Sequence, residues 1–347
     1  MKIVVAILMF ITLKVAHAES VLINGLLFAL TFSVIIWCAI AVAHHAEELA
    51  VKYGEPYGTM ILTLSAVAIE VILLAVMMAG ANNPTLARDT IYSALMLDIN
   101  GILGVAAIIG GMKYKEQSYN FDSSNSYITM LCVAIGVCMI VPEFLSSAHW
   151  KLYSGYCIVM TVAMYGVFLW FQTSKKHYSY FFTHKEMDAE DLEADTEINA
   201  WKHALFLFTF LVAVGLLSEG MEHSLNVVSE ASHMPKAVIG ILIAIISASS
   251  ELLTAFRASW KNNMQAVVNI ALGASVATVL LTIPCIEIIS LMTDKDIIMG
   301  LTPVQTVMTL LTLFVAMVTL QDGETNAIEG MAHFALFTAF VMLSFIF

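Results

Sequence analysis

Charged residues are scarce in this chain of 347 residues: only 12% are Asp, Glu, Lys or Arg, whereas 60% are hydrophobic. A soluble globular domain carries about twice that share of charge, so the composition excludes a soluble globule. The charges that do occur cluster between long apolar runs and do not alternate along helix faces. The sequence therefore predicts an all-α polytopic membrane protein whose first partner is the lipid bilayer.

The chain also lacks the motifs of metal-binding, redox and catalytic sites. Its five cysteines have no CxxC or Cys/His ligand spacing and lie inside apolar runs, which is typical of small packing residues. No HExxH, GxSxG or GxGD motif lies in a span, and this argues against an intramembrane protease. The net charge of −12 argues against a nucleic-acid partner. We expect neither enzyme activity nor a bound cofactor.

Apolar runs recur along the whole chain and predict helical spans, because a barrel would show shorter alternating segments. The first run has a basic start and ends in Ala16-His17-Ala18, which imitates a cleaved signal peptide, but Lys14 interrupts its core. We therefore favour a retained first helix. The eleven predicted spans are 2–17, 22–43, 57–80, 89–111, 126–145, 152–173, 203–218, 236–258, 264–292, 299–320 and 327–346.

Basic residues are unevenly distributed between the two sets of loops. The loops on the side of Met1 contain more Lys and Arg than those on the opposite side, so the positive-inside rule orients the chain. It places the N-terminus and the long central loop in the cytoplasm and Phe347 outside. The residues on the Met1 side are Lys2, Lys52, Lys113, Lys115, Lys175, Lys176, Lys185, Lys202, Arg257 and Lys261.

One long hydrophilic stretch divides the chain into two sets of five spans. We predict an N-terminal helix (1–20), a first repeat (21–175), an acidic cytoplasmic linker (176–202) and a second repeat (203–347). Repeats with an odd number of spans enter the membrane in opposite senses, as in inverted-repeat transporters with a midplane site. Within the linker, the acidic segment 186–197 is either a solvated connection or an element that attracts or senses cations.

A single carboxylate lies near the middle of each of two spans, Glu70 in 57–80 and Glu251 in 236–258. A charge at that depth costs roughly 3 kcal/mol or more, and no Lys or Arg lies near the middle of these spans to pair with it. Hydroxyls accompany both acids, and hard oxygen ligands of this kind suit Ca²⁺ or Na⁺. When the cation leaves, burial favours the protonated carboxylates. One site can therefore hold the metal or protons, not both.

Other polar residues are predicted to complete the site or to lead to it. Hydroxyl, carboxyl and carboxamide groups on the same spans and on the spans that follow them are the expected additional ligands; these are Thr63, Asp98, Asn100, Ser247, Ser250 and Ser275. Polar residues near the ends of spans are expected to form vestibules or proton relays, with exposed helix ends as the alternative. They are His45, Glu47, Glu219, Glu222, Asp322 and Glu329.

Three segments resemble the signatures of a known family. Segment 45–58 (HAEELAVKYGEPYG) followed by Glu70 resembles the first signature of the calcium–proton antiporters of the cation/calcium exchanger superfamily, especially the bacterial ChaA type. Glu251, followed by 261–264 (KNNM) and 273–275 (GAS), is similar to the second signature. Segment 322–330 (DGETNAIEG) is similar to the start of the family's final helix.

The resemblance implies eleven helices, one plus two inverted repeats of five, with Glu70 and Glu251 as the central cation- and proton-binding acids. It implies a multi-pass secondary antiporter of the bacterial inner membrane that exports Ca²⁺ in exchange for protons. The Gly-Asn pair that precedes each Glu in the wider family is replaced here by Ala66-Val67 and Ser247-Ala248. This departure leaves the selectivity open, and the ChaA type is associated with Na⁺ and K⁺ as well. The alternative is therefore a Na⁺(K⁺)/H⁺ antiporter with little Ca²⁺ transport.

Overall fold

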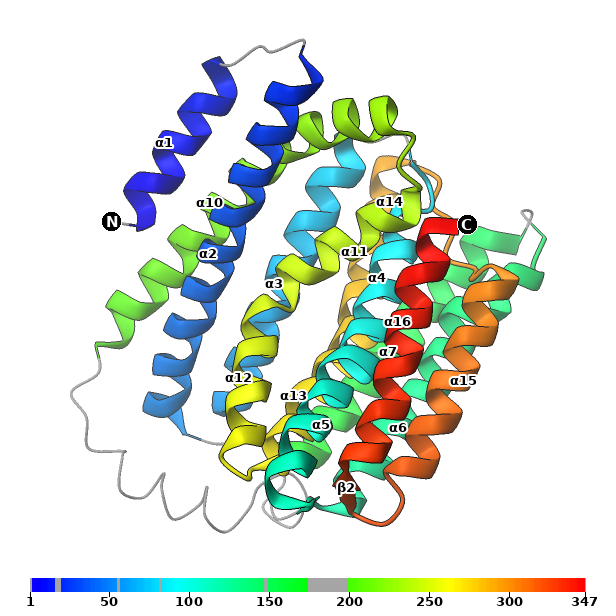
Figure 1. Cartoon of the computed structure of the whole chain (residues 1–347). Coiled ribbons are helices and arrows are strands. Elements are labelled where there is room, and N and C mark those ends of the chain that lie inside the picture. The colour runs from blue at the N-terminus through cyan, green and yellow to red at the C-terminus, as the bar shows by residue number, and fades with distance from the viewer. Residues whose placement is uncertain are drawn as a thin grey trace.

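A computed structural model describes residues 2–15, 20–54, 57–80, 83–146, 149–173 and 199–346. Nearly all of these residues are helical, as predicted (Figure 1). Among them, eight helices are long and apolar enough to cross a membrane, or nine if one bent pair counts as a single span. Two shorter apolar helices accompany them. The all-α membrane fold is thus confirmed, whereas the count of eleven spans and the inverted repeat stay predictions.

Most of the helices follow one another with short connections, and three long rods among the described residues each contain a π-helical segment. In the first half they are α1 (Lys2–Val15), α2 (Val21–Tyr53), α3 (Tyr57–Gly80), α4 (Leu86–Met96), η1 (Leu97–Ile102), α5 (Leu103–Tyr114), α6 (Phe121–Ile135), η2 (Gly136–Ile140), η3 (Val141–Phe144) and α7 (Trp150–Thr173). In the second half they are α10 (Ala200–Ser232), α11 (Lys236–Ser247), α12 (Ser249–Trp260), α13 (Met264–Ala277), η5 (Thr278–Thr282), α14 (Ile283–Thr293), α15 (Pro303–Thr319) and α16 (Ala327–Ile346).

Three helices differ clearly from the predicted spans. Helices α2 and α10 each continue for more than two turns past the end of the apolar run, because the residues beyond it include good helix formers such as Ala, Glu and Leu. The run 236–258 is not one straight helix: α11 and α12 meet at Ala248 with a bend of 60°. The acidic segment 186–197 and residues 16–18 lie outside the described residues.

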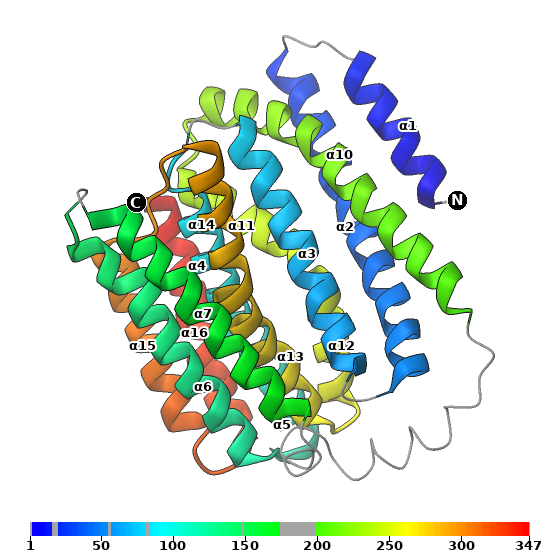
Figure 2. The same cartoon turned by 180° about the vertical axis from the view of Figure 1, so that it is seen from behind.

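The helices pack as one bundle with α3 between two groups. Helices α1, α2 and α10 pack against one another on one side of the bundle, and α10 also contacts α3 (Figure 1). The other side contains α5, α6, α7, α15 and α16. Seen from behind, α3 lies between the α2–α10 pair and the α13–η5–α14 rod (Figure 2). The middle of α3 therefore faces the interior of the bundle.

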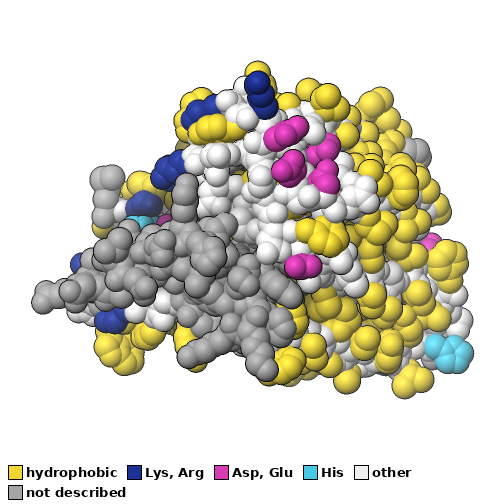
Figure 3. Space-filling model, turned by 90° about the horizontal axis from the view of Figure 1, so that it is seen from below, with side chains coloured by type: hydrophobic (Ala, Val, Ile, Leu, Met, Phe, Trp, Pro, Cys, Tyr) yellow, Lys and Arg dark blue, Asp and Glu magenta, His cyan; other side chains and the backbone are white. Residues whose placement is uncertain are grey.

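A two-stranded antiparallel sheet closes one end of the bundle. Strand β1 (Glu116–Ser118) pairs with β2 (Glu324–Asn326), so the connections before α6 and before α16 are joined. Figure 3, seen from this end, shows acidic side chains gathered on the surface beside a few basic ones. The exposed acids around the sheet are Glu116, Asp122, Asp322 and Glu324.

Helices α5 and α16 touch backbone to backbone at Gly104 and Gly330. A Cβ atom on Gly330 would lie 2.6 Å from the carbonyl oxygen of Gly104 and 2.7 Å from the amide nitrogen of Ile108. Because these atoms belong to the backbone, the helices would have to separate. We expect Gly330→Ala to destabilise the protein by about 1–3 kcal/mol and to lower the midpoint of thermal unfolding in detergent.

The matched control for this prediction is Gly166→Ala on α7, where an added Cβ meets nothing within 4 Å. Alanine has the higher helix propensity, so this variant should unfold at or slightly above the wild-type temperature. Equal midpoints for Gly330→Ala and Gly166→Ala would contradict the close contact between α5 and α16.

Candidate functional site

Glu70 lies in the interior of the bundle, with its side chain pointing from α3 toward η5. One carboxylate oxygen, Oε2, accepts hydrogen bonds from the hydroxyls of Thr278 at 2.9 Å and Thr282 at 2.7 Å. The two threonines are four residues apart, so they share one face of their helical segment. The other oxygen, Oε1, is buried and has no hydrogen-bond partner among the described residues. The carboxylate is thus held in place with one oxygen available for a cation or a proton.

Asp98 is a second buried acid and comes from the π-helical segment η1. Its Oδ2 accepts a hydrogen bond from the Ser275 hydroxyl of α13 at 3.2 Å, whereas Oδ1 is buried without a partner in the described part of the chain. π-helical turns inside α-helices are frequent at functional sites. Here η1 interrupts the α4–α5 rod at Asp98, and η5 interrupts the α13–α14 rod at Thr278 and Thr282. The two interruptions therefore supply side chains to the same region.

Glu251 lies in the first turn of α12, immediately after the bend at Ala248. The N-terminus of a helix carries partial positive charge, which favours a carboxylate there. Asp98 interacts electrostatically with both Glu251 and Glu70, and Glu251 interacts with Glu70. Within the described residues, none of the three acids forms an ion pair with Lys or Arg. The described part of the bundle therefore contains three neighbouring acids without a basic partner, of which Glu70 and Asp98 are buried and Glu251 is half-buried.

These acids do not form a closed metal shell. Among the described residues, no three His, Cys, Asp or Glu side chains lie close enough together to hold a metal ion. A cation between the acids would need further oxygens from hydroxyls, backbone carbonyls or water. The bend at Ala248 is one source, because carbonyls at the end of a helix lack their usual intrahelical donors.

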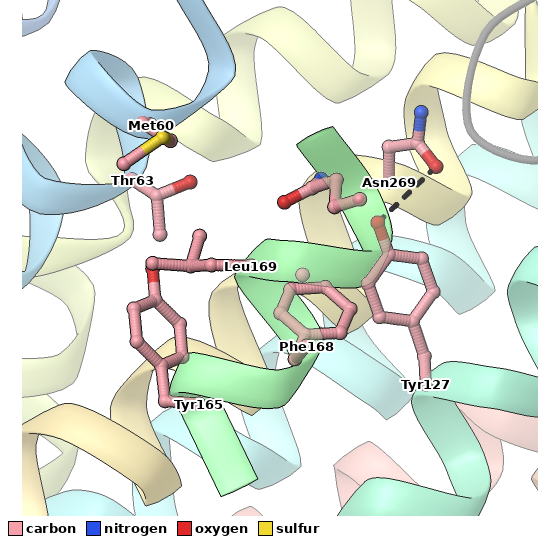
Figure 4. A pocket seen from close by; sticks show the side chains of 9 residues that line it. Met60, Thr63, Tyr127, Tyr165, Phe168, Leu169 and Asn269 are labelled. Carbon is pink, nitrogen blue, oxygen red and sulfur yellow. Dashed lines mark hydrogen bonds between the residues drawn. The ribbon is translucent and has the colours of Figure 1, made fainter. Parts of the chain in front are cut away.

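The predicted hydroxyl ligands lie at different distances from this centre. Ser275 contacts Asp98, as described. Ser247 donates its hydroxyl to the carbonyl oxygen of Ala244 at 3.1 Å, next to the bend, and Ser250 is half-buried in the first turn of α12. Thr63 lies two turns before Glu70 and borders a separate pocket (Figure 4). Of these four, only Ser275 has a hydrogen bond to one of the acids.

Asn100 is buried but does not face the acids. Its carboxamide nitrogen donates to the Thr312 hydroxyl of α15 at 2.7 Å, and its oxygen accepts from Nδ1 of His333 on α16 at 3.0 Å. Residues i and i+2 of a helix point in widely different directions, so Asp98 and Asn100 cannot share one face. Asn100 therefore joins its helix to α15 and α16, and we do not propose it as a ligand.

The predicted vestibule residues of the two long helices lie at different depths. His45 and Glu47 lie in the last third of α2, whereas Glu219 and Glu222 lie just past the middle of α10. His45 Nδ1 lies 3.2 Å from Nδ1 of His203, which joins α2 to α10, and its ring stacks on that of Phe206. Glu47 is exposed close by. Glu219 is exposed on α10, and Glu222 accepts a hydrogen bond from Asn226. None of these side chains contacts Glu70, Asp98 or Glu251 within the described structure.

The remaining two predicted vestibule residues lie beside the sheet. Asp322 is exposed and accepts a hydrogen bond from the backbone amide of Glu324 at 3.1 Å. Glu329 accepts one from the carboxamide of Asn326 at 3.1 Å. Both acids thus stabilise the turn before α16 at the end of the bundle. Any relay from here to the central acids would need intermediate groups.

The sequence-based prediction missed Thr278 and Thr282, which hold Glu70. Their signal is present in the chain: two hydroxyls four residues apart in a run that is otherwise apolar. The spacing shows that they share a face, but it does not show that this face meets α3.

These observations define a multi-span membrane protein whose described interior holds several acids without basic partners. The chain belongs to the sodium/calcium exchanger protein family, whose pattern matches residues 23–174 and 202–346. This is a family of transporters. The predicted resemblance to ChaA-type exchangers is thereby confirmed.

Individual relatives and one solved structure agree with this assignment. The chain is 33% identical to the sodium-potassium/proton antiporter ChaA of Escherichia coli strain K12 over 90% of this chain and 86% of that protein. It is 32% identical to the putative ionic transporter y4hA of Sinorhizobium fredii over 88% of this chain and 84% of the relative. The structure of the Ca²⁺/H⁺ antiporter protein YfkE is similar with a TM-score of 0.78 at 19% identity, covering 100% of this chain and 98% of that chain. Homologues of this protein are thus cation/proton antiporters.

Proposed function

We propose that this protein is a secondary antiporter that exports a cation from the cytoplasm in exchange for protons. The observation that carries the proposal is the cluster of Glu70, Asp98 and Glu251 in the membrane bundle. The first two acids are buried and Glu251 is half-buried, and none of them has a basic partner among the described residues. Charges at such depth are costly unless a counter-ion or proton neutralises them. A cation and protons compete for the same carboxylates, so each leaves when the other binds.

The geometry supports a different role for each residue of the site. Thr278 and Thr282 fix Oε2 of Glu70, which leaves Oε1 to bind the cation or a proton. Glu251 faces Glu70 from the start of α12, where the helix terminus favours its charged form. The similar placement of η1 and η5 in the two halves supports inverted repeats around a midplane site. The positive-inside rule supports a cytoplasmic N-terminus, and the bacterial relatives support a location in the inner membrane.

Ca²⁺ is the first candidate for the exported cation. Glu70 and Glu251 together would neutralise one Ca²⁺, and oxygen donors suit this hard ion. The similarity of the fold to that of a Ca²⁺/H⁺ antiporter supports the same choice. Na⁺ or K⁺ is the second candidate, because the relative at 33% identity is a sodium-potassium/proton antiporter. The replacement of the Gly-Asn pairs by Ala66-Val67 and Ser247-Ala248 also weakens the case for a family-typical Ca²⁺ shell.

Everted membrane vesicles with an imposed pH gradient test this proposal. We expect Ca²⁺ added to the medium to dissipate the gradient, with Na⁺ and K⁺ acting only at higher concentration. A dye whose fluorescence recovers as the gradient collapses reports the exchange. Vesicles from cells that lack the protein are the control. Recovery with Na⁺ or K⁺ but not Ca²⁺ would identify the second candidate, and no recovery with any of the three would refute antiport.

A further inference from the structure

A small pocket with several polar side chains lies on the Thr63 side of Glu70, separate from the three acids. It has a volume of about 20 Å³ and lies between α3, α6, α7 and α13 (Figure 4). Thr63 and Tyr165 border it on one side, and Tyr127 and Asn269 on the other. Thr63 precedes Glu70 by seven residues, which places it on nearly the same face of α3 and about 10 Å along the helix axis.

Two polar side chains at this pocket are buried without a hydrogen bond to any described residue. Gln172 and Tyr165, both on α7, line the pocket with only 5% and 6% of their surface exposed. Their polar atoms are open to the pocket, where a water molecule or a small ion can reach them. The volume suits about one water molecule or one small ion.

The described lining of the pocket is neutral but rich in oxygen. Three hydroxyls and two carboxamides are present, from Thr63, Tyr127, Tyr165, Gln172 and Asn269, and none of the described residues that line it is an acid or a base. Neutral oxygens attract a cation more weakly than carboxylates do, so a cation here keeps part of its water shell. The rings of Tyr127 and Tyr165 add the weak attraction of aromatic faces. Such a lining binds a cation loosely and releases it readily.

All four helices bring these residues to the end of the bundle that holds the sheet. Thr63, Tyr127 and Asn269 lie near the starts of α3, α6 and α13, and Gln172 lies at the end of α7. The proposed orientation makes this end cytoplasmic. A cation moving from the cytoplasm to Glu70 along this face of α3 would meet the pocket first.

We propose that this pocket is a staging site that holds the partly hydrated cargo cation on its way from the cytoplasm to Glu70. The proposal rests on the antiport function above and adds a second, neutral site to it. Gln172 and Tyr165 supply its otherwise unpartnered oxygens, and Asn269 and Tyr127 complete it from the opposite side. The pocket binds the cation while it still carries part of its water shell, whereas the acids bind the cation after it has lost more of that water.

Gln172→Met tests the staging site, because methionine has a similar volume but no carboxamide. In everted vesicles the cation reaches the cytoplasmic face, and we expect its apparent KM to rise about three- to tenfold with an unchanged maximal rate. In right-side-out vesicles the cation reaches the opposite face, and the KM there should not change. A variant that acts only through folding would lower the maximal rate in both.

Gly273→Ala is a second variant that does not remove a polar group. Its added Cβ would lie 3.7 Å from the Tyr127 hydroxyl, an ordinary contact, so it narrows the pocket without moving a helix. We expect the same one-sided rise in KM. Gly166→Ala on α7, which has open space around it, is the matched control and should behave as wild type.

The outcomes separate this inference from the proposed function. Wild-type exchange with an unchanged cytoplasmic KM in both Gln172→Met and Gly273→Ala would overturn the staging site and leave antiport intact. An equal change in KM from both faces would also overturn it. Absence of exchange in wild-type vesicles would refute the antiport function itself, and the staging site with it.

Discussion

Glu70→Gln is expected to abolish cation-dependent dissipation of a pH gradient in everted vesicles. Glutamine retains the shape of the side chain and an oxygen that can accept from Thr278 and Thr282, but it neither neutralises a cation nor exchanges a proton. Leaving a buried ion without its counter-charge costs about 3 kcal/mol or more, so exchange should fall roughly 100-fold or further. Glu251→Gln should have the same effect, because both acids are required at once.

Two kinds of control distinguish loss of charge from loss of structure. Glu287→Gln removes another buried acid, which lies on α14 beside Ser154 and Cys157 of α7, away from the proposed site. We expect this variant to exchange cations normally. Thr282→Val removes one hydrogen bond to Glu70 but keeps its charge, so about tenfold loss is expected. Full exchange by Glu70→Gln and Glu251→Gln would refute the carboxylate mechanism.

The positions of the central acids could be predicted because the signal is local. The length of an apolar run and the cost of a charge inside it both depend on neighbouring residues in the sequence. Glu70 and Glu251 therefore stood out in the chain before any helix was placed. The same reasoning predicted the membrane-spanning helical fold, which the structure confirms.

The partners of the acids could not be predicted, because they depend on which helix faces meet. Thr278 and Thr282 contact Glu70 across 208 and 212 positions of the sequence. Their orientation also depends on the wider turn of η5, which tertiary packing stabilises and residue propensity does not reveal. The bend at Ala248 is similar: the small residues around it permit a break, but they do not require one.

The sequence alone is enough to predict that Asp98 and Asn100 lie on different faces of their helix. Two residues that are two positions apart on a helix point about 200° apart, which excludes a shared ligand face. Helical geometry would thus have kept only one of the two as a candidate ligand. Which one faces the acids depends on packing: Ser275 binds Asp98, whereas Thr312 and His333 bind Asn100.

Asp98→Asn is expected to weaken the binding of divalent cations far more than the binding of monovalent ones. The Coulomb energy between Asp98 and a bound cation is proportional to the charge of the cation, so the loss for Ca²⁺ is twice that for Na⁺ or K⁺. Fold-changes multiply where energies add, so the increase in half-maximal concentration for Ca²⁺ should be about the square of that for Na⁺. Roughly tenfold for Na⁺ would correspond to roughly 100-fold for Ca²⁺.

Titrations with Na⁺ and Ca²⁺ in everted vesicles that contain wild type or Asp98→Asn measure the two fold-increases. If Ca²⁺ is not itself transported, its half-maximal concentration is measured as that of an inhibitor of Na⁺ exchange. Ser275→Ala is the matched control, because it removes the hydrogen bond to Asp98 at 3.2 Å and keeps the charge. Ser275→Ala should raise the half-maximal concentrations less than Asp98→Asn does. Its fold-increase for Ca²⁺ should not equal the square of its fold-increase for Na⁺. Equal fold-changes for Na⁺ and Ca²⁺ in Asp98→Asn would mean that the residue acts through packing. Unchanged titrations would mean that Asp98 stays protonated throughout the cycle, which would leave Glu70 and Glu251 as the whole of the charged site.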